Sequence, residues 1–209
     1  MRGVANTELT PELAFNLGKV GTYVLRKIKQ NPLVLIGKDT RLSGDLLENA
    51  ITSGILSMGG NVVKVGILPT PAIAYLVKHM KADAGVMISA SHNTYEFNGI
   101  KFFNSEGFKL DDDIEDEIED IIVRDMDVNS HIEGDRLGRC IEAVDDGAGR
   151  YAEFLKSTID VSLEGMKLVI DCANGAAYRV APEALWELGA EVVSIGVEPD
   201  GFNINRDVG

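Results

Sequence analysis

The 209-residue sequence has few cysteines, no long apolar run and far fewer basic than acidic residues. Its two cysteines, Cys140 and Cys172, form no CxxC or Cys/His spacing, which argues against a zinc site and excludes a disulfide framework. No apolar run reaches the ~18 residues that a membrane span requires, and no basic start followed by an apolar stretch marks a signal peptide. We therefore expect a cytoplasmic protein with no membrane partner.

The shortage of basic residues also restricts the partners. Twenty Lys and Arg against 33 Asp and Glu give a formal net charge of −13. A field of this sign repels phosphate polymers, so we expect no nucleic-acid partner. A small phosphorylated ligand is still compatible with this charge, because a local cluster of Lys, Arg and backbone N–H groups can bind phosphate. The composition, with 45% hydrophobic residues, is that of a globular protein with a real core.

Short apolar runs alternate with segments of helical periodicity in the first part of the chain. The apolar runs predict buried strands at residues 33–36, 62–65 and 84–88, and shorter strands at 100–103 and 108–110. Capping residues and apolar spacing predict helices that begin at Thr10-Pro11 (with a stripe reaching Ile28), Ser43, Pro69 and Asp111. This alternation is typical of a three-layer α/β/α domain with a mixed, mostly parallel sheet.

A second unit of similar construction follows. Residues 126–147 lose periodicity and contain several Gly and Asp, so we place the boundary there and assign 1–147 and 148–209 to two domains. Residues 58–66 and 188–196 share the pattern of helix end, glycine, strand and glycine, which indicates a second, similar α/β domain. Its expected elements are helices at 151–159 and 182–188 and strands at 168–171 and 192–195. At about 60 residues it is short for a finished domain, so we expect it to be incomplete, with an exposed sheet edge.

The most informative segment, residues 89–93, reads Ser-Ala-Ser-His-Asn and follows the predicted strand 84–88. In open α/β sheets, ligands bind outside the carboxyl ends of the strands, and a serine there can act as a nucleophile. A catalytic triad is not favoured, because no GxSxG surrounds Ser91 and the adjacent His92 is expected to point elsewhere. On composition alone, a plain serine-rich loop remains the alternative.

Four ordered motifs resemble those of the α-D-phosphohexomutase family. Residues 85–93 and 98–103 are similar to the family's active-site serine segment, and residues 37–44 to its Gly-Lys-Asp-Thr-Arg-x-Ser-Gly loop. Residues 2–6 resemble the end of its N-terminal motif, and residues 171–176 the start of its second domain. Within the family, the branch that acts on glucosamine phosphates is the one whose sequences this chain resembles more than those of the branches acting on mannose or glucose phosphates. The resemblance lies in the segments Ile-Ser-Ala-Ser-His-Asn and Asn-Gly-Ile-Lys-Phe-Phe.

The resemblance implies a phosphorylated hexosamine as substrate and Ser91 as the carrier of the transferred phosphoryl group. Phosphorylated Ser91 would convert glucosamine 6-phosphate into a 1,6-bisphosphate. That intermediate would turn around, return its other phosphoryl group to Ser91 and leave as glucosamine 1-phosphate, a precursor of cell-wall amino-sugar nucleotides. The cofactor implied is Mg²⁺, bound to an oxygen of the phosphate on Ser91.

The resemblance also implies roles for five other residues. Lys101 would act as a general acid/base or a stabilising cation, and Arg2 would contact the phosphoryl group. His92, Asn93 and Arg41 would bind substrate or shape the serine loop.

Asp39 is expected to form a supporting ion pair with Arg41. His79 and His131 have no site context and are predicted to be surface residues.

Departures from the family's pattern leave alternatives open. Thr94 stands where the family has Pro, which would loosen the serine loop, and the family's metal loop and C-terminal phosphate-binding domain would follow Gly209. We therefore expect the 209 residues alone to be inactive. The alternatives are a phosphomannomutase/phosphoglucomutase of the same family, or a non-catalytic module that binds sugar phosphates or forms oligomers. A homodimer also stays open.

Overall fold

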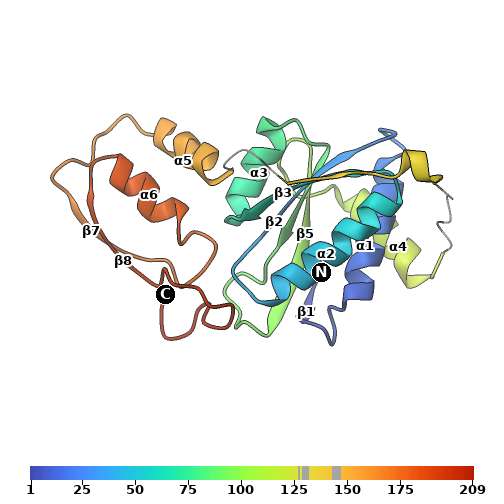
Figure 1. The fold of residues 1–209 in the computed structure, drawn as a ribbon, viewed down its shortest axis with the longest axis horizontal. Coiled ribbons are helices and arrows are strands. Elements are labelled where there is room, and N and C mark those ends of the chain that lie inside the picture. The colour runs from blue at the N-terminus through green and yellow to red at the C-terminus, as the bar shows by residue number, and fades with distance from the viewer. Residues whose placement is uncertain (127, 129–131, 143–146) are drawn as a thin grey trace.

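A six-stranded mixed sheet forms the centre of the first domain (Figure 1). The computed structural model describes residues 1–126, 128, 132–142 and 147–209. The strand order is β1-β5-β4-β2-β3-β6, and β5 runs antiparallel to both of its neighbours while the other pairs are parallel. The strands are β1 (Arg2–Val4), β2 (Leu33–Lys38), β3 (Asn61–Ile67), β4 (Ala84–Ile88), β5 (Phe97–Asn104) and β6 (Cys140–Glu142).

Helices cover both faces of this sheet. Val34 and Ile36 of β2 pack into the core with α1 (Pro11–Leu25), α2 (Ser43–Ser57) and α4 (Asp112–Val123). Leu35, between them, faces α3 (Thr70–His79) on the opposite side. Successive side chains of a strand point to opposite faces, so a strand buried on both sides must be apolar at every position. The predicted three-layer α/β/α domain with a mixed, mostly parallel sheet is confirmed.

The strand predictions hold best at the centre of the sheet. The runs at 33–36, 62–65 and 84–88 are β2, β3 and β4, where β4 matches to the residue and β2 and β3 extend at most two residues further at either end. The predicted strand at 108–110 is wrong, because this segment makes one isolated bridge to Phe103 at Lys109 and then enters α4. Strands β1 and β6, both at sheet edges, were not predicted.

Two helix termini differ from the predictions. Thr10 Oγ1 accepts a hydrogen bond from the Leu13 N–H at 3.2 Å, as a capping residue should, but α1 ends at Leu25. Ile28 therefore lies beyond the helix and is 78% exposed. Ser43 is the first residue of α2 and not its cap, because its hydroxyl accepts a hydrogen bond from the Asn98 amide.

The second unit contains α5 (Gly147–Ser157), β7 (Lys167–Asp171), α6 (Val180–Glu187) and β8 (Glu191–Ile195), which confirms its four predicted elements. Strands β7 and β8 form a separate two-stranded parallel sheet, on the left of Figure 1. Residues 143–146, within the predicted boundary, lie outside the described residues. The assignment of 1–147 and 148–209 to two domains stays a prediction.

The repeated pattern has a backbone counterpart. Gly59 and Gly189 follow α2 and α6 with φ of +77° and +100°, and Gly66 and Gly196 end the following strands with φ of +77° and +60°. These left-handed conformations favour glycine, which explains why the same residue recurs at both places.

Candidate functional site

The serine loop joins β4 to β5 at the carboxyl end of the parallel strands. The Asp39 N–H, directly after β2, donates to the carbonyl of Ile88 at 3.0 Å, and the Ser89 N–H donates to the carbonyl of Gly99 at 2.9 Å. The loops that follow β2 and β4 therefore lie side by side. A Cβ at Gly99 would lie 2.8 Å from the Ser89 carbonyl oxygen, so the close approach of these strands requires glycine.

Ser91 has an uncommon backbone conformation. Its φ is +59°, in the left-handed region that costs a non-glycine residue about 1–2 kcal/mol. Its N–H donates to Ser89 Oγ at 3.0 Å, and the residue itself is exposed. The strained backbone thus presents the Ser91 hydroxyl to solvent while the neighbouring serine holds the loop from inside.

The sequence predicts that His92 points away from Ser91, and the structure shows that its ring faces Ser91 instead. Its Nδ1 lies 3.5 Å from Ser91 Oγ, at the outer limit of a hydrogen bond. Both residues are exposed. A separation of this length does not activate the serine by itself, so the geometry still gives no support to a triad.

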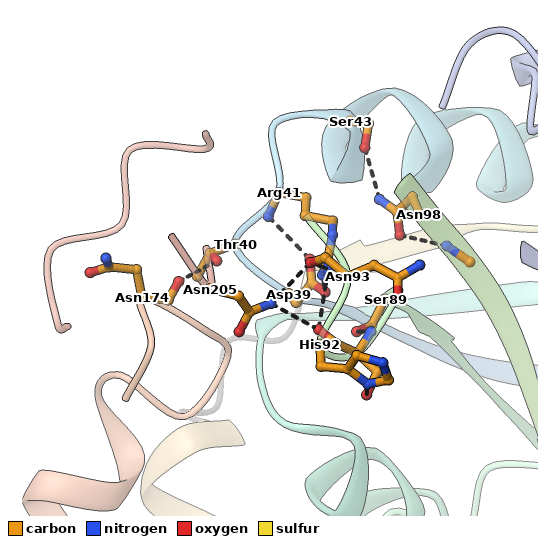
Figure 2. Close-up of polar contacts among 12 residues, drawn as sticks. Asp39, Thr40, Arg41, Ser43, Ser89, His92, Asn93, Asn98, Asn174 and Asn205 are labelled. Atoms are coloured by element: carbon orange, nitrogen blue, oxygen red, sulfur yellow. Dashed lines mark hydrogen bonds and ion pairs between the residues drawn. The ribbon is translucent and has the colours of Figure 1, made fainter. Parts of the chain in front are cut away.

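Arg41 binds backbone carbonyls of the serine loop (Figure 2). Its side chain is fully buried, and it pairs with Asp39, which confirms the predicted ion pair. Its Nη2 donates to the carbonyls of Ser91 at 3.2 Å and Asn93 at 2.6 Å. Burial lowers the pKa of Arg41, an effect that the charge of Asp39 opposes and that of Arg2 adds to.

Asn98 is a buried residue of the site that sequence reasoning did not single out for a role. Its amide Nδ2 donates to Ser43 Oγ at 2.9 Å, and its Oδ1 accepts from the Gly99 N–H at 2.8 Å. The side chain therefore connects the start of β5 to the start of α2 (Figure 2). Its place in the matched Asn-Gly-Ile-Lys-Phe-Phe segment was the available signal.

Arg2 and Lys101 lie in a groove of about 830 Å³ beside the strands β1 and β5. Arg2 pairs with Gly99 and Lys101 follows two residues later, so both side chains are on the face of the sheet that α3 covers. Ser91 is not one of the residues that line this groove. Arg2 is nevertheless close enough to Arg41, which binds the serine loop, for its charge to help lower the pKa of Arg41.

The second unit contacts the serine loop directly. Asn205 Nδ2 donates to the carbonyls of Ser91 at 3.3 Å and Asn93 at 3.0 Å. The Tyr95 and Phe202 rings meet edge to face with centroids 5.3 Å apart. Sequence reasoning missed these contacts, because no periodicity or spacing relates residues more than 100 positions apart.

The described residues do not by themselves form a metal site. Within them, no three or more His, Cys, Asp or Glu side chains gather as metal ligands. Asp39, in the neighbouring loop after β2, is already paired with Arg41. Mg²⁺ prefers several oxygen ligands in octahedral geometry, and this part of the chain does not offer that set.

The described residues also bear on the predictions made for the two remaining histidines and for a membrane span. His79 is exposed, as predicted, and its ring stacks on Tyr75. His131 lies outside the described residues. Over the described ranges, no helix combines the length and apolar character needed to cross a bilayer.

Comparisons with known proteins identify the family to which this chain belongs. Residues 1–128 match the family described as phosphoglucomutase/phosphomannomutase, alpha/beta/alpha domain I, and the chain belongs to this family. Among curated relatives, the phosphoglucosamine mutase of Caldicellulosiruptor bescii is 58% identical over 211 residues, and that of Clostridium novyi 55% over 212. Both alignments cover 100% of this chain and 46% of the relative, so the chain spans about half the length of the relatives it matches.

A solved structure agrees with the family assignment. The phosphoglucomutase/phosphomannomutase family protein of Burkholderia thailandensis has a TM-score of 0.80 and is 27% identical. The match covers 96% of this chain and 43% of that one. The likeness therefore extends through the second unit, beyond the residues that the family match covers.

Proposed function

We propose that this chain takes part in the interconversion of glucosamine 6-phosphate and glucosamine 1-phosphate, with Ser91 as the phosphoryl carrier. The observation that carries the proposal is the exposed Ser91 in a strained backbone, held by buried groups at the carboxyl end of the sheet. Relatives named phosphoglucosamine mutase, 50–58% identical over the whole chain, support the choice of substrate.

The proposed chemistry is two phosphoryl transfers in sequence. In the first, the C1 hydroxyl oxygen of glucosamine 6-phosphate attacks the phosphorus of phosphorylated Ser91, and the bond from phosphorus to Ser91 Oγ breaks. The electron pair stays on Oγ, which gains the proton that the sugar hydroxyl loses. In the second, Ser91 Oγ attacks the 6-phosphate of the reoriented bisphosphate, and the departing sugar oxygen takes the proton. Atoms and charge balance over the cycle.

The proposed roles of the other residues follow from charge and position. Phosphoryl transfer is promoted mainly by positioning and by neutralisation of the equatorial oxygens. We assign the neutralising cations to Lys101 and Arg2, which reach the groove beside β5. Arg41, with His92 and Asn93, would shape the serine loop. Mg²⁺ on the phosphate of Ser91 would add positive charge when bound, with further ligands from outside the described residues.

The alternative within the family is a mutase for glucose or mannose phosphates. The similarity to the phosphoglucomutase/phosphomannomutase family protein of Burkholderia thailandensis is the observation that favours it. Its 27% identity is far below the 58% of the phosphoglucosamine mutase from Caldicellulosiruptor bescii, so we prefer the amino sugar.

The test combines substrate choice with the phosphorylation site. In the full-length protein, supplied with Mg²⁺ and a 1,6-bisphosphate activator, we expect turnover of glucosamine 6-phosphate to exceed that of glucose or mannose 6-phosphate by at least about 10-fold, which corresponds to the net contribution of one hydrogen bond. Phosphopeptide mapping should find phosphate on Ser91. The variant Ser91→Ala should lose both the phosphopeptide and turnover.

The control is Ser89→Ala, in the same loop. Ser89 Oγ accepts the Ser91 N–H, so its removal loosens the loop, but the phosphopeptide should persist. Phosphate found on Ser89 alone would refute the assignment, and a preference for mannose or glucose phosphate would favour the alternative.

A further inference from the structure

Two side chains from different units bind the same pair of carbonyl oxygens in the serine loop (Figure 2). Arg41 Nη2 donates to the carbonyls of Ser91 and Asn93 at 3.2 and 2.6 Å. Asn205 Nδ2 donates to the same two oxygens at 3.3 and 3.0 Å. Each carbonyl thus accepts one hydrogen bond from the first domain and one from the second unit.

The position of Asn205 is fixed within its own unit. Its N–H donates to the carbonyl of Ala173 at 2.9 Å, and its φ is +57°. The neighbouring Asn174 organises the turn before it, because its Oδ1 accepts from the Glu198 N–H at 3.1 Å and its Nδ2 donates to the Asn203 carbonyl at 3.4 Å.

Two further hydrogen bonds join this turn to the loop after β2. Thr40 Oγ1 donates to the carbonyl of Asn174 at 2.5 Å, and the Leu42 N–H donates to the carbonyl of Gly201 at 3.1 Å. Thr40 and Leu42 flank Arg41 in the chain. The same short loop therefore places both donors of the shared carbonyls.

The residue type at 205 fits this task. A left-handed backbone is tolerated best by Gly, Asn and Asp. Of these three, only Asn carries an N–H donor, whereas an Asp carboxylate would face the carbonyl oxygens with negative charge. Asparagine thus combines the observed backbone with the observed contact.

We propose that Asn205 is a positioning residue for phosphoryl transfer at Ser91. By holding the carbonyls of Ser91 and Asn93, it fixes the Ser91–His92 and Asn93–Thr94 peptide planes and hence the direction of the Ser91 side chain. Misplacement of a reacting group by about 1 Å can cost about 10²-fold in rate. The inference rests on the proposed function and extends it, because it makes the second unit part of the serine site.

The kinetic test uses Asn205→Asp and Asn205→Gly in the full-length protein. Asn205→Asp keeps size and backbone tolerance but replaces the donor with an acceptor, and Asn205→Gly removes the side chain. We expect kcat to fall about 10- to 100-fold for Asp and less for Gly, with KM within about 3-fold, because positioning acts on the transition state. The control is Asp207→Asn, which exchanges the same two residue types in the reverse direction at an exposed position that also has φ of +57°. Its kcat should stay within twofold of the wild-type value.

A second readout does not depend on activity. In the 209-residue chain, the N–H groups of Ser91, Asn93 and Phe97 are hydrogen-bonded within the loop, so hydrogen exchange reports its order. Asn205→Asp should speed their exchange at least about 10-fold, and Asp207→Asn should leave it unchanged. Unfolding temperatures, measured in parallel, separate this local effect from global destabilisation.

The outcomes distinguish the inference from the proposed function. An inactive wild type whose hydrogen exchange responds to Asn205→Asp would overturn the proposed function but would still show that Asn205 orders the serine loop. An active wild type with unchanged kcat in Asn205→Asp would overturn the positioning role, as would unchanged exchange. If Asn205→Asp does not fold, Asn205→Gly decides by the same criteria.

Discussion

Ser91 keeps its left-handed backbone because neighbouring groups bind its N–H and its carbonyl oxygen. The cost of about 1–2 kcal/mol for this conformation is comparable to one hydrogen bond to a charged group, which contributes about 1.5–3 kcal/mol. Arg41 supplies two such bonds and Ser89 a neutral one. The strain is therefore offset locally, and the hydroxyl remains exposed.

Lys101 is the residue whose predicted role is most open to a direct kinetic test. Lys101→Ala in the full-length protein should lower kcat at least about 10²-fold while KM changes by less than about 3-fold. The reason is that a cation beside the transferring group interacts with charge that develops in the transition state. The measurement is steady-state turnover of glucosamine 6-phosphate.

The matched control is Lys78→Ala, which removes an exposed lysine paired with Glu106. An exposed pair of this kind contributes about 0–1 kcal/mol, so this variant should behave as the wild type. A rise in KM for Lys101→Ala with unchanged kcat would show that Lys101 only binds substrate.

At the scale of elements, glycines set the distance between α1 and α2. A Cβ at Gly54 would lie 2.1 Å from the Phe15 carbonyl oxygen, and one at Gly18 would lie 2.3 Å from the Ile51 carbonyl oxygen. Backbone atoms of a helix cannot rotate away, so any larger residue must push the two helices apart. These positions determine how closely the two helices pack against each other.

Gly54→Ala should lower the free energy of unfolding by about 3 kcal/mol through this overpacking. Gly21→Ala, in α1, is the control, because the nearest atom to its added Cβ is Phe102 Cε1 at 3.6 Å. That substitution should be neutral or stabilising by up to about 1 kcal/mol, since alanine favours the helix. Urea unfolding of both variants measures the difference, and equal losses would contradict the packing argument.

Lys38, at the end of β2, joins the sheet to α2. Its Nζ donates to Asp45 at 2.6 Å and to the buried Glu48 at 2.7 Å. Burial lowers the pKa of Lys38, but the hydrogen bonds and charges of the two carboxylates outweigh it, and the net shift is upward. The charged lysine therefore stabilises the folded state.

Lys38→Met should destabilise the protein by about 2 kcal/mol at neutral pH, because Glu48 loses its nearest cation. A raised pKa means that this contribution is fully present below the ordinary lysine value of 10.5 and is lost as pH rises through the folded-state pKa. The difference between wild type and variant should therefore shrink above about pH 10.5. Unfolding measured at pH 8 and pH 11 checks this, and a constant difference would argue against the ion pair as the cause.

The elements that could be predicted are those with a pattern of their own. Strand β4 was placed to the residue because all five of its side chains are buried. Strand β6 was missed because its three residues follow a polar stretch without alternation, and only pairing with β3 makes them a strand. The end of α1 was missed because Ile28 continues the apolar spacing although it contacts solvent.

At the scale of the whole molecule, the serine site is assembled from segments that are remote in sequence. The motif at residues 89–93 and the Asp39–Arg41 pair could be predicted from the chain alone. The contact of Asn205 with the serine loop could not, because it arises only when the second unit packs against the loop after β2. The parts that depend on local pattern were therefore predictable, and the parts that depend on docking were not.

The last prediction concerns what residues 1–209 can do by themselves. We expect the isolated chain to fold and yet to give no sustained conversion of glucosamine 6-phosphate. Two phosphoryl transfers require neutralisation of the reacting phosphate, a grip on the sugar's second phosphate and exclusion of water. Among the described residues, Arg2 and Lys101 lie in a groove that Ser91 does not line, and no carboxylate cluster is present to hold Mg²⁺. Each missing positioning element costs up to about 10²-fold, so their combined loss puts turnover below detection.

The measurement is a coupled assay for glucosamine 1-phosphate with Mg²⁺ and a 1,6-bisphosphate activator. Circular dichroism of the same sample confirms that the chain is folded. Sustained turnover by the folded chain would show that the groups described here suffice, and that no further Mg²⁺ ligands or phosphate contacts are required.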